Sequence, residues 1–167
     1  DGTGEIQVRG PAVMLGYYRD PVATTQAFTE DGWFRTGDLG HLGKRGALFI
    51  TGRQKNLIIL PNGKNVQPEE IEEALLGGIA YLREVVVHEL VDQTGAPRIA
   101  ASAFLDPDWV GGVGFEGARA RFEADVAAVN QRLAVYKRVC LTNLREHEFE
   151  KTSTRKIMRH RVEGALA

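Results

Sequence analysis

The sequence predicts an α+β protein with two structural units, a small β-rich segment over residues 1–52 and a compact α/β domain over residues 57–167. Short apolar runs that alternate with polar residues dominate the first unit, as in half-buried strands. The second unit combines apolar strands with apolar residues that recur every three or four positions, which is typical of helices with one buried face. The polar and basic residues 53–56 separate the two patterns and indicate a joint between two structural units.

The composition is that of an ordinary globular protein. Of the 167 residues, 43% are hydrophobic and 26% are charged, and the formal net charge is −1. This balance gives no electrostatic argument for nucleic acid or an anionic membrane as a partner. The apolar runs are too short for a transmembrane segment and no signal peptide precedes them, so we expect a cytoplasmic protein.

Cysteine and histidine usage argues against disulfide or metal chemistry. The chain has one cysteine and four histidines. A single cysteine excludes an intrachain disulfide, and the apolar neighbours of Cys140 predict a buried side chain rather than a nucleophile. The histidines lack the spacing of metal ligands, so we expect no metal site.

The first unit contains few regular elements. Alternating residues predict a strand over residues 4–9, and residues 47–51 predict a second strand. Asp20 followed by Pro21 predicts the cap and first turn of a short helix that ends near Phe28. These elements are too few for a stable core, so we expect this unit to pack against a missing part of the protein or to form a small barrel-like sheet with uncovered edges.

The second unit opens with an apolar strand at residues 57–60 and a turn at residues 61–63. A helix then begins at Pro68, because proline suits the first helical turn and the acidic residues that follow suit the positive end of the helix dipole. The pair Gly77 and Gly78 supplies the stop.

The rest of this unit predicts two strands, a helix and a last strand. Residues 84–90 and 98–105 are strand candidates joined by a hairpin turn at residues 92–95. A flexible loop at residues 109–114 precedes the helix, and residues 139–144 form the last strand. Five apolar residues with helical spacing mark the buried face of that helix: Phe122, Val126, Val129, Leu133 and Tyr136.

Two polar segments each allow two interpretations from the residues alone. Residues 33–38, Trp-Phe-Arg-Thr-Gly-Asp, are either a β-hairpin with Gly37 and Asp38 in its turn, or a carboxylate held by a tight turn where it can bind a diol. Residues 152–159 are rich in hydroxyl and basic groups. Composition alone favours the solvated start of a basic helix there.

The order of these segments resembles the adenylate-forming superfamily, which includes acyl-CoA synthetases, luciferases and the adenylation domains of peptide synthetases. Gly-Arg-x-Lys at residues 52–55, Asn-Gly-Lys-Asn-Val at residues 62–66 and Pro-Glu-Glu-Ile-Glu at residues 68–72 are similar to the hinge of that family and the strand after it. Residues 34–38 resemble its Tyr/Phe-Arg-Thr-Gly-Asp motif, and residues 152–159 resemble its closing motif, Thr-x-x-Gly/Arg-Lys-Ile-x-Arg.

The resemblance implies roles for individual residues. Asp38 would hold the two ribose hydroxyls of ATP and AMP, with Arg53 near the same nucleotide. Lys55 falls at the hinge position, where lysine is similar to the long-chain and medium-chain acyl-CoA synthetase branches. Lys156 would be the catalytic lysine that reaches the acyl carboxylate and the α-phosphate, although Arg155 replaces the glycine of many relatives.

The resemblance also implies a channel for the pantetheine arm of CoA. Gly63 has no side chain and would let the arm pass close to the backbone. The alternative is an ordinary Asn-Gly hairpin turn without this role. Four consecutive residues form the proposed channel loop: Asn62, Gly63, Lys64 and Asn65.

The resemblance covers nearly the whole chain but only the last third of such an enzyme, because the phosphate loop and the adenine-binding motif have no counterpart in these residues. It implies the C-terminal part of an acyl-CoA synthetase that acts on fatty or aryl acids, fatty acids being the main expectation, with ATP, Mg²⁺ and CoA. A missing N-terminal AMP-binding domain would lie in the same chain. We expect the isolated residues to be inactive. A peptide-synthetase-like domain that loads a carrier protein and a non-catalytic binding module of the same fold remain as alternatives.

Overall fold

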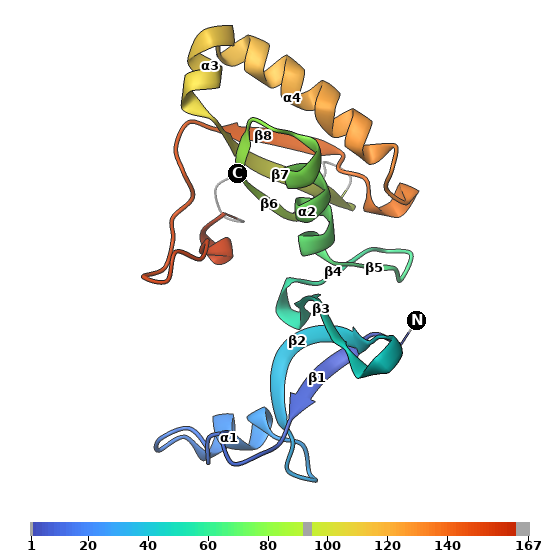
Figure 1. The fold of residues 1–167 in the computed structure, drawn as a ribbon, viewed down its shortest axis with the longest axis vertical. Coiled ribbons are helices and arrows are strands. Elements are labelled where there is room, and N and C mark those ends of the chain that lie inside the picture. Colours follow the sequence, from blue (N-terminus) through green and yellow to red (C-terminus); the bar gives the residue numbers. More distant parts are fainter. Residues whose placement is uncertain (1, 92–94, 163–167) are drawn as a thin grey trace. The chain divides into compact units, whose positions relative to one another are not determined.

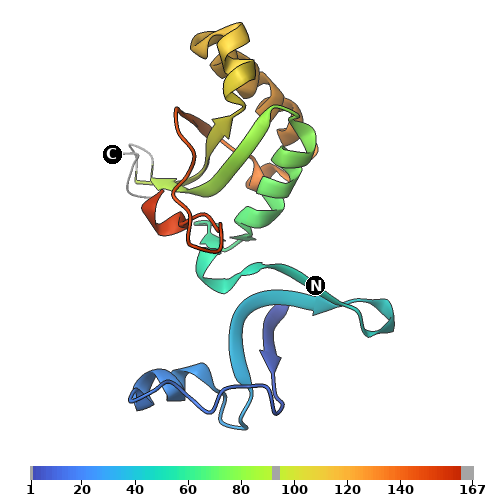
Figure 2. The ribbon, with the colours of Figure 1, turned by 60° about the vertical axis from the view of Figure 1, so that its left-hand side comes forward.

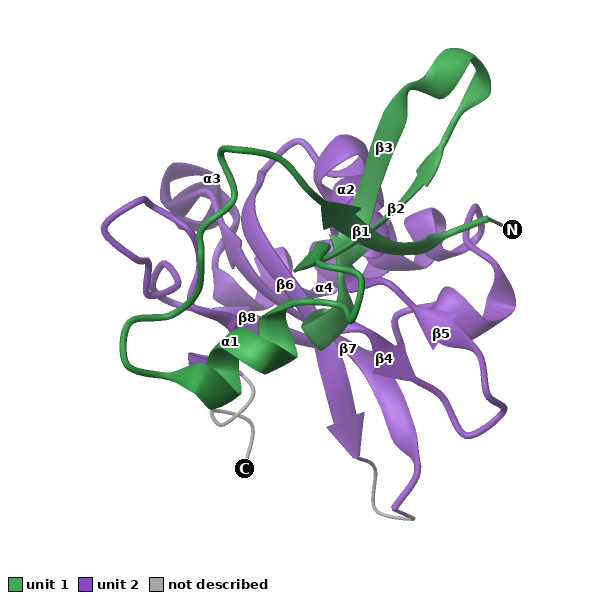
Figure 3. Ribbon diagram, turned by 90° about the horizontal axis from the view of Figure 1, so that it is seen from below, with its two compact units in different colours: residues 1–56 green, residues 57–167 purple. Residues whose placement is uncertain are grey.

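The computed structural model describes residues 2–91 and 95–162 and confirms the α+β class. The chain divides into two compact units, residues 1–56 and residues 57–167, which Figure 3 shows in different colours. Among the described residues, no helix has the length and apolar character that crossing a membrane requires.

Unit 1 is built on an open antiparallel sheet of three strands in the order β1–β2–β3 (Figure 1). The strands are β1 (Gly4–Val8), β2 (Phe34–Leu42) and β3 (Leu48–Arg53). Helix α1 (Pro21–Ala27) begins as predicted, because the Asp20 side chain accepts a hydrogen bond from the backbone N–H of Ala23 at 2.8 Å. Two 3₁₀ turns, η1 (Lys44–Gly46) and η2 (Gln54–Asn56), flank β3.

Unit 2 begins with a short hairpin and continues with a second three-stranded sheet. The hairpin pairs β4 (Ile58–Ile59) with β5 (Asn65–Val66). In the larger sheet, β6 (Leu82–Val91) runs antiparallel to β7 (Pro97–Leu105), and β7 runs parallel to β8 (Leu141–Arg145). Residues 92–94 of the turn predicted at residues 92–95 lie outside the described residues.

Helices α2 (Pro68–Gly78) and α4 (Phe115–Asn130) lie on one face of this sheet (Figure 2). Alternate side chains of a strand point to opposite faces, so Val85 and Val87 of β6 join the core under the helices. Val86 points to the other face. There it packs with Phe104, and the C-terminal segment covers both through Phe149 and Val162.

The prediction of a loop at residues 109–114 is wrong, because most of this stretch belongs to helix α3 (Pro107–Val113). The carboxylate of Asp106 accepts hydrogen bonds from the N–H groups of Asp108 and Trp109, at 2.9 and 3.3 Å, which caps the first turn. Gly114 ends the helix with a φ of 75°, a conformation that glycine adopts without strain.

The buried face of α4 is shorter than predicted. Phe122, Val126 and Val129 are buried, but the helix stops at Asn130. Leu133 follows the helix and Tyr136 lies in the 3₁₀ turn η3 (Val135–Lys137), although both still pack against the core.

The expectation of a buried Cys140 is also wrong, since its side chain is exposed. The preceding residue, Val139, occupies the buried position with 6% of its surface exposed. Cys140 lies between this buried residue and strand β8, which begins only at Leu141.

We predict opposite effects for two neighbouring glycines of α2. A Cβ on Gly78 would lie 2.8 Å from Cγ2 of the buried Val129, so Gly78→Ala should lower the free energy of unfolding by about 1–3 kcal/mol. Gly77 has nothing within 4 Å of that position, so Gly77→Ala should raise stability by about 0.5–1 kcal/mol. Urea unfolding of both variants checks this, and equal effects would contradict close packing of α2 against α4.

Candidate functional site

Asp38 and Arg53 face each other across the β2–β3 pair, which brings together two residues predicted for nucleotide binding. Nε of Arg53 lies 2.7 Å from Oδ1 of Asp38. The Asp38 side chain is 28% exposed and that of Arg53 is 49% exposed, so both remain accessible. The carboxylate can therefore accept hydrogen bonds from a ligand while the guanidinium balances its charge.

The interpretation of Gly37 and Asp38 as a hairpin turn is wrong, because both lie inside β2. The β1–β2 register shifts at this point, between Glu5 and Gln7. Gly37 has a φ of 70°, so the strand bends sharply one residue before the carboxylate. This irregularity determines the direction in which Asp38 leaves the strand.

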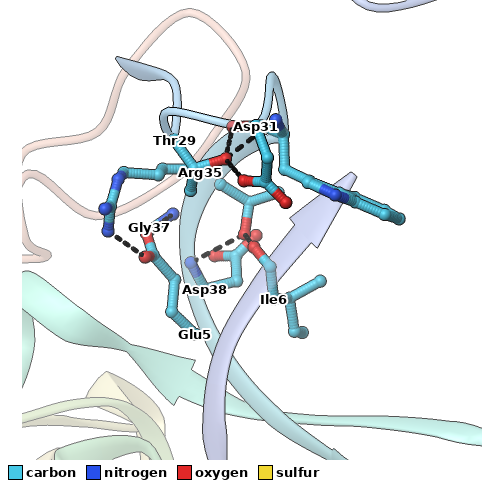
Figure 4. A network of polar contacts seen from close by, with 9 residues as sticks. Glu5, Ile6, Thr29, Asp31, Arg35, Gly37 and Asp38 are labelled. Carbon is cyan, nitrogen blue, oxygen red and sulfur yellow. Dashed lines mark hydrogen bonds and ion pairs between the residues drawn. The ribbon is translucent and has the colours of Figure 1, made fainter. Parts of the chain in front are cut away.

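A network of hydrogen bonds holds the bend in place (Figure 4). The Thr36 hydroxyl donates to the carbonyl of Ile6 at 2.7 Å and accepts from the N–H of Asp38 at 3.0 Å. The carboxylate of Glu5 accepts from the N–H of Gly37 at 3.3 Å and from Arg35 at 3.1 Å. The backbone around Asp38 is thus bound to β1 on both sides of the bend.

A small pocket of about 300 Å³ lies beside this pair. Lys55, the predicted hinge residue, lies in η2 and lines the pocket together with Arg53. Gly37 and Gln54 complete the lining. Two basic side chains around one pocket suit a ligand that carries both hydroxyl and anionic groups.

The predicted channel loop forms the turn of the β4–β5 hairpin. The N–H of Leu60 donates to the carbonyl of Lys64 at 3.0 Å, and the N–H of Gly63 donates to the carbonyl of Leu60 at 2.9 Å. Asn62 accepts from the N–H of Lys64 at 3.1 Å. Gly63 has a φ of 74° and open space around the position of a Cβ. The backbone at Gly63 is therefore accessible from outside unit 2.

A pocket of about 330 Å³ adjoins this loop. The ammonium of Lys64 lies 4.7 Å from the ring centre of Tyr136, which is part of the pocket wall. The exposed Cys140 is part of the same wall. The remaining lining residues are Leu60, Pro61, Asn62, Ala96, Pro97, Arg98, Ile99, Val135 and Arg138.

Lys156 lies on a closed turn between residues 151 and 157, which pair as an antiparallel bridge. The hydroxyl of Thr152 accepts a hydrogen bond from the N–H of Lys156 at 3.2 Å, and the N–H of Thr152 donates to the carbonyl of Lys156 at 2.8 Å. The interpretation of residues 152–159 as the start of a helix is therefore wrong. Arg155 has a φ of 60°, a backbone conformation that glycine adopts without strain.

The Lys156 side chain is exposed. Within the part of the chain that the structure describes, its ammonium has no ion-pair partner. A free cation on a structured turn is a suitable group for stabilising negative charge on a substrate.

Sequence reasoning missed a partly buried ion pair that follows this turn in the chain. Arg159 binds the carboxylate of Glu72 on α2. Glu72 is only 9% exposed and also accepts from the N–H of Val87 at 2.7 Å. A signal was present, because Pro68, Glu72, Leu75 and Ile79 recur every three or four positions and place this acid on the buried stripe.

Two curated relatives cover most of this chain, whereas no family model matches it. The chain is 43% identical over 118 residues to the long-chain-fatty-acid–CoA ligase FadD15 of Mycobacterium tuberculosis. This match covers 71% of the chain and 18% of the relative. The chain is also 37% identical over 159 residues to a long-chain-fatty-acid–CoA ligase of Bacillus subtilis. This match covers 95% of the chain and 26% of the relative.

A solved structure agrees with these relatives. The ATP-bound MatB of Rhodopseudomonas palustris superimposes with a TM-score of 0.78 and 26% identity, over 96% of this chain and 30% of MatB. The chain belongs to the adenylate-forming superfamily. It corresponds to the C-terminal part of these enzymes and spans about a quarter or less of the length of the two curated relatives.

The described residues contain no group of three or more histidine, cysteine, aspartate or glutamate side chains that could hold a metal ion. The resemblance described in the sequence analysis implies Mg²⁺ together with ATP. The two nucleotide-binding candidates, Asp38 and Arg53, form an ion pair and not a metal ligand set.

We predict a pH-dependent contribution of Glu72 to stability. Burial raises the pKa of its carboxyl above the ordinary value of 4.5, and the repulsion of Glu69 adds to this, while Arg159 and the N–H of Val87 act in the opposite direction. The folded protein thus binds this proton more tightly than the unfolded chain. The stabilising contribution of Glu72 is then complete below pH 4.5 and is lost as the pH rises through the raised pKa.

Glu72→Gln removes this titration. The free energy of unfolding of the wild type minus that of Glu72→Gln should therefore decrease as the pH rises from about 4 to about 7. Urea unfolding at a series of pH values measures this difference. A difference that grows with pH would show that ionisation of Glu72 stabilises the fold.

Proposed function

We propose that this chain is the C-terminal part of an ATP-dependent acyl-CoA synthetase. The whole enzyme activates a carboxylic acid as acyl-AMP and transfers the acyl group to CoA. The observation that carries the proposal is the exposed ammonium of Lys156 on a closed turn, without an ion-pair partner among the described residues. The names of the two curated relatives favour a fatty acid as the substrate.

Lys156 provides the electrostatic part of the adenylation step. When a carboxylate oxygen bonds to the α-phosphorus, the bond from that phosphorus to the pyrophosphate oxygen breaks and pyrophosphate leaves. Two anionic groups meet in this step, and a positioned cation lowers the energy of that arrangement. The lysine forms no bond to the substrate. Its contribution depends on where the ammonium is held, because the reacting groups must approach in line.

Asp38 and Arg53 bind the nucleotide. The carboxylate of Asp38 accepts hydrogen bonds from the two ribose hydroxyls, and Arg53 lies 2.7 Å away, where its remaining N–H groups reach ribose or phosphate oxygens. The bend at Gly37 keeps the carboxylate in one direction. A ligand with a vicinal diol then binds without reorganisation of the strand.

The second half of the reaction uses a different part of unit 2. Asn62, Gly63, Lys64 and Asn65 line the passage of the pantetheine arm, and the open space at Gly63 supports this role. We propose residues 53–56 as the hinge and Lys55 as its pivot, about which residues 57–167 turn between adenylation and thioester formation.

The remaining parts of the enzyme lie outside this chain. A large AMP-binding domain on the N-terminal side supplies the triphosphate and acyl pockets, and Mg²⁺ enters with ATP. Exposed apolar residues on unit 1 support such a partner in the same polypeptide: Leu42, Leu48, Phe49 and Ile50. The 167 residues alone are then inactive, and the enzyme acts in the cytoplasm.

Lys156→Ala in the whole enzyme should slow acyl-adenylate formation by roughly 10²- to 10³-fold, the effect of losing one preorganised charge-stabilising group. Conversion of supplied acyl-adenylate with CoA should stay within about twofold, because that step does not use the lysine. Pre-steady-state measurement of each half-reaction checks both statements.

Arg155→Gly is the matched control for Lys156→Ala, since it removes the neighbouring positive charge and relieves the positive φ. It should leave both half-reactions unchanged. Equal damage to both half-reactions by Lys156→Ala would assign the lysine a structural role. Acyl transfer to a carrier protein in preference to CoA would identify a carrier-loading enzyme.

Asp38→Ala should weaken ATP binding by about 1.5–3 kcal/mol, because a charged hydrogen-bond acceptor for the ribose is lost. Calorimetric titration of the whole enzyme with ATP measures the affinity. Glu30→Ala, which removes an exposed carboxylate of the same unit, is the control and should not change it. Unchanged ATP affinity in Asp38→Ala would contradict the assignment of the diol site.

A further inference from the structure

We propose that Glu72 and Glu84 are positioning residues for Lys156. The turn that carries Lys156 is attached to the sheet at both of its flanks, and a glutamate makes each attachment. This inference rests on the proposed function, because it assigns a purpose to the geometry of a lysine that acts in adenylation.

The flank before the turn is held by Glu84 of strand β6. One carboxylate oxygen of Glu84 accepts a hydrogen bond from the N–H of Phe149 at 2.9 Å, and the other binds the ammonium of Lys151. The Glu84 side chain is 14% exposed, so these contacts are largely protected from water. Phe149 itself is buried with Val86 and Phe104, on the face of the sheet that is covered by the C-terminal segment after β8, called the tail below.

The flank after the turn is held by Glu72 of helix α2. Glu72 binds the guanidinium of Arg159 with one oxygen and the N–H of Val87 with the other, the second at 2.7 Å. Arg159 also donates to the carbonyl of Val87 at 3.3 Å. The carbonyl of Val87 thus binds Arg159 directly, and its N–H binds the carboxylate that holds Arg159.

The position of Val87 in the sheet explains why this attachment is rigid. The sheet order β6–β7–β8 makes β6 an edge strand, whose outward backbone groups need partners. At Val87 those partners are Glu72 and Arg159. Displacement of Arg159 would leave a buried carboxylate and a backbone carbonyl without their partner, which is energetically expensive.

The energetics favour a geometric role for this contact. Burying an ion pair removes two charges from water, and an apolar pair of similar volume often gives equal or greater stability. The guanidinium of Arg159 contacts Glu72, Glu69 at 3.9 Å and the Val87 carbonyl, and these three contacts together restrict its orientation. The contact therefore defines where the tail lies.

The distance along the chain from these attachments to Lys156 is short. Ile157, the next residue, packs against the apolar cluster of Val86, Phe104, Phe149 and Val162. Thr152 closes the turn from the other side through its hydrogen bonds with Lys156. Little backbone freedom remains, so the two glutamates determine the region that the ammonium can reach.

The same tail offers a matched control. Glu150 binds Arg161, but their side chains are 61% and 55% exposed, and the pair lies on the surface. Exposed pairs of this kind contribute little to structure. Glu150→Gln thus makes the same chemical change as Glu72→Gln and Glu84→Gln without releasing the turn.

The test measures both half-reactions in the whole enzyme for these three variants and for Arg159→Lys. Glu72→Gln and Glu84→Gln should each slow acyl-adenylate formation by about 10- to 10²-fold, because a misplaced charge stabilises the transition state poorly. KM for ATP and the rate of thioester formation from supplied acyl-adenylate should stay within about twofold. Arg159→Lys keeps the charge but loses the planar fork, and should also slow only adenylation.

Lys156→Ala, measured alongside, separates the two proposals. If Lys156→Ala leaves adenylation unchanged, the proposed function fails. If Lys156→Ala slows adenylation but Glu72→Gln, Glu84→Gln and Arg159→Lys behave like Glu150→Gln, the positioning role alone is overturned. Equal losses in both half-reactions that follow a lower melting temperature would also overturn it. Should Glu72→Gln not fold, Glu84→Gln and Arg159→Lys decide the question by the same criteria.

Discussion

Strand β6 is the element on which unit 2 depends. Both of its faces pack against other segments, and the backbone groups along its outer edge form hydrogen bonds with side chains. Val85 and Val87 face the helices, Val86 faces the C-terminal segment, and the outer edge bonds to Glu72 and Arg159. A strand with both faces buried must be apolar on consecutive residues, as Val85-Val86-Val87 is. The polar contacts that attach the tail to β6 are then restricted to the ends and the outer edge of this strand.

The two units differ in how far they can stabilise themselves. Unit 2 has a continuous core from α2, α4 and the larger sheet, and a second cluster under the tail. Unit 1 has three strands and one short helix, and it leaves large apolar side chains such as Leu42 and Ile50 mostly exposed. A small sheet with an uncovered apolar side is stabilised by packing against another surface. This difference agrees with the match to the C-terminal part of longer enzymes.

Each of the three candidate motifs contains one residue in the left-handed region of backbone conformation. Gly37 precedes Asp38, Arg155 precedes Lys156, and Gly63 lies inside the proposed channel loop, with φ values between 60° and 74°. Such a residue reverses the local backbone, so the next side chain leaves the element in a direction that regular secondary structure does not provide. Of these three residues only Arg155 is not a glycine, so its left-handed conformation carries a cost in backbone strain.

The sequence by itself determined the α+β class, the start of α2 at Pro68 and the motifs around Asp38, Gly63 and Lys156, because these depend on neighbouring residues. Caps, apolar periodicity and turn residues act over a few positions, and a resemblance depends on order alone. Helix α3 carried such a local signal in Asp106 and Pro107, but its glycines made a loop the stronger expectation.

Tertiary structure decided what depends on residues far apart in the chain. The contact of Glu72 with Arg159 joins residues 87 positions apart, and the pairing of Asp38 with Arg53 depends on the register of two strands. The exposure of Cys140 follows from which neighbour enters the core. Burial and ion pairing are properties of the assembled packing, where a side chain becomes buried only when other segments cover it, and no local pattern contains that information.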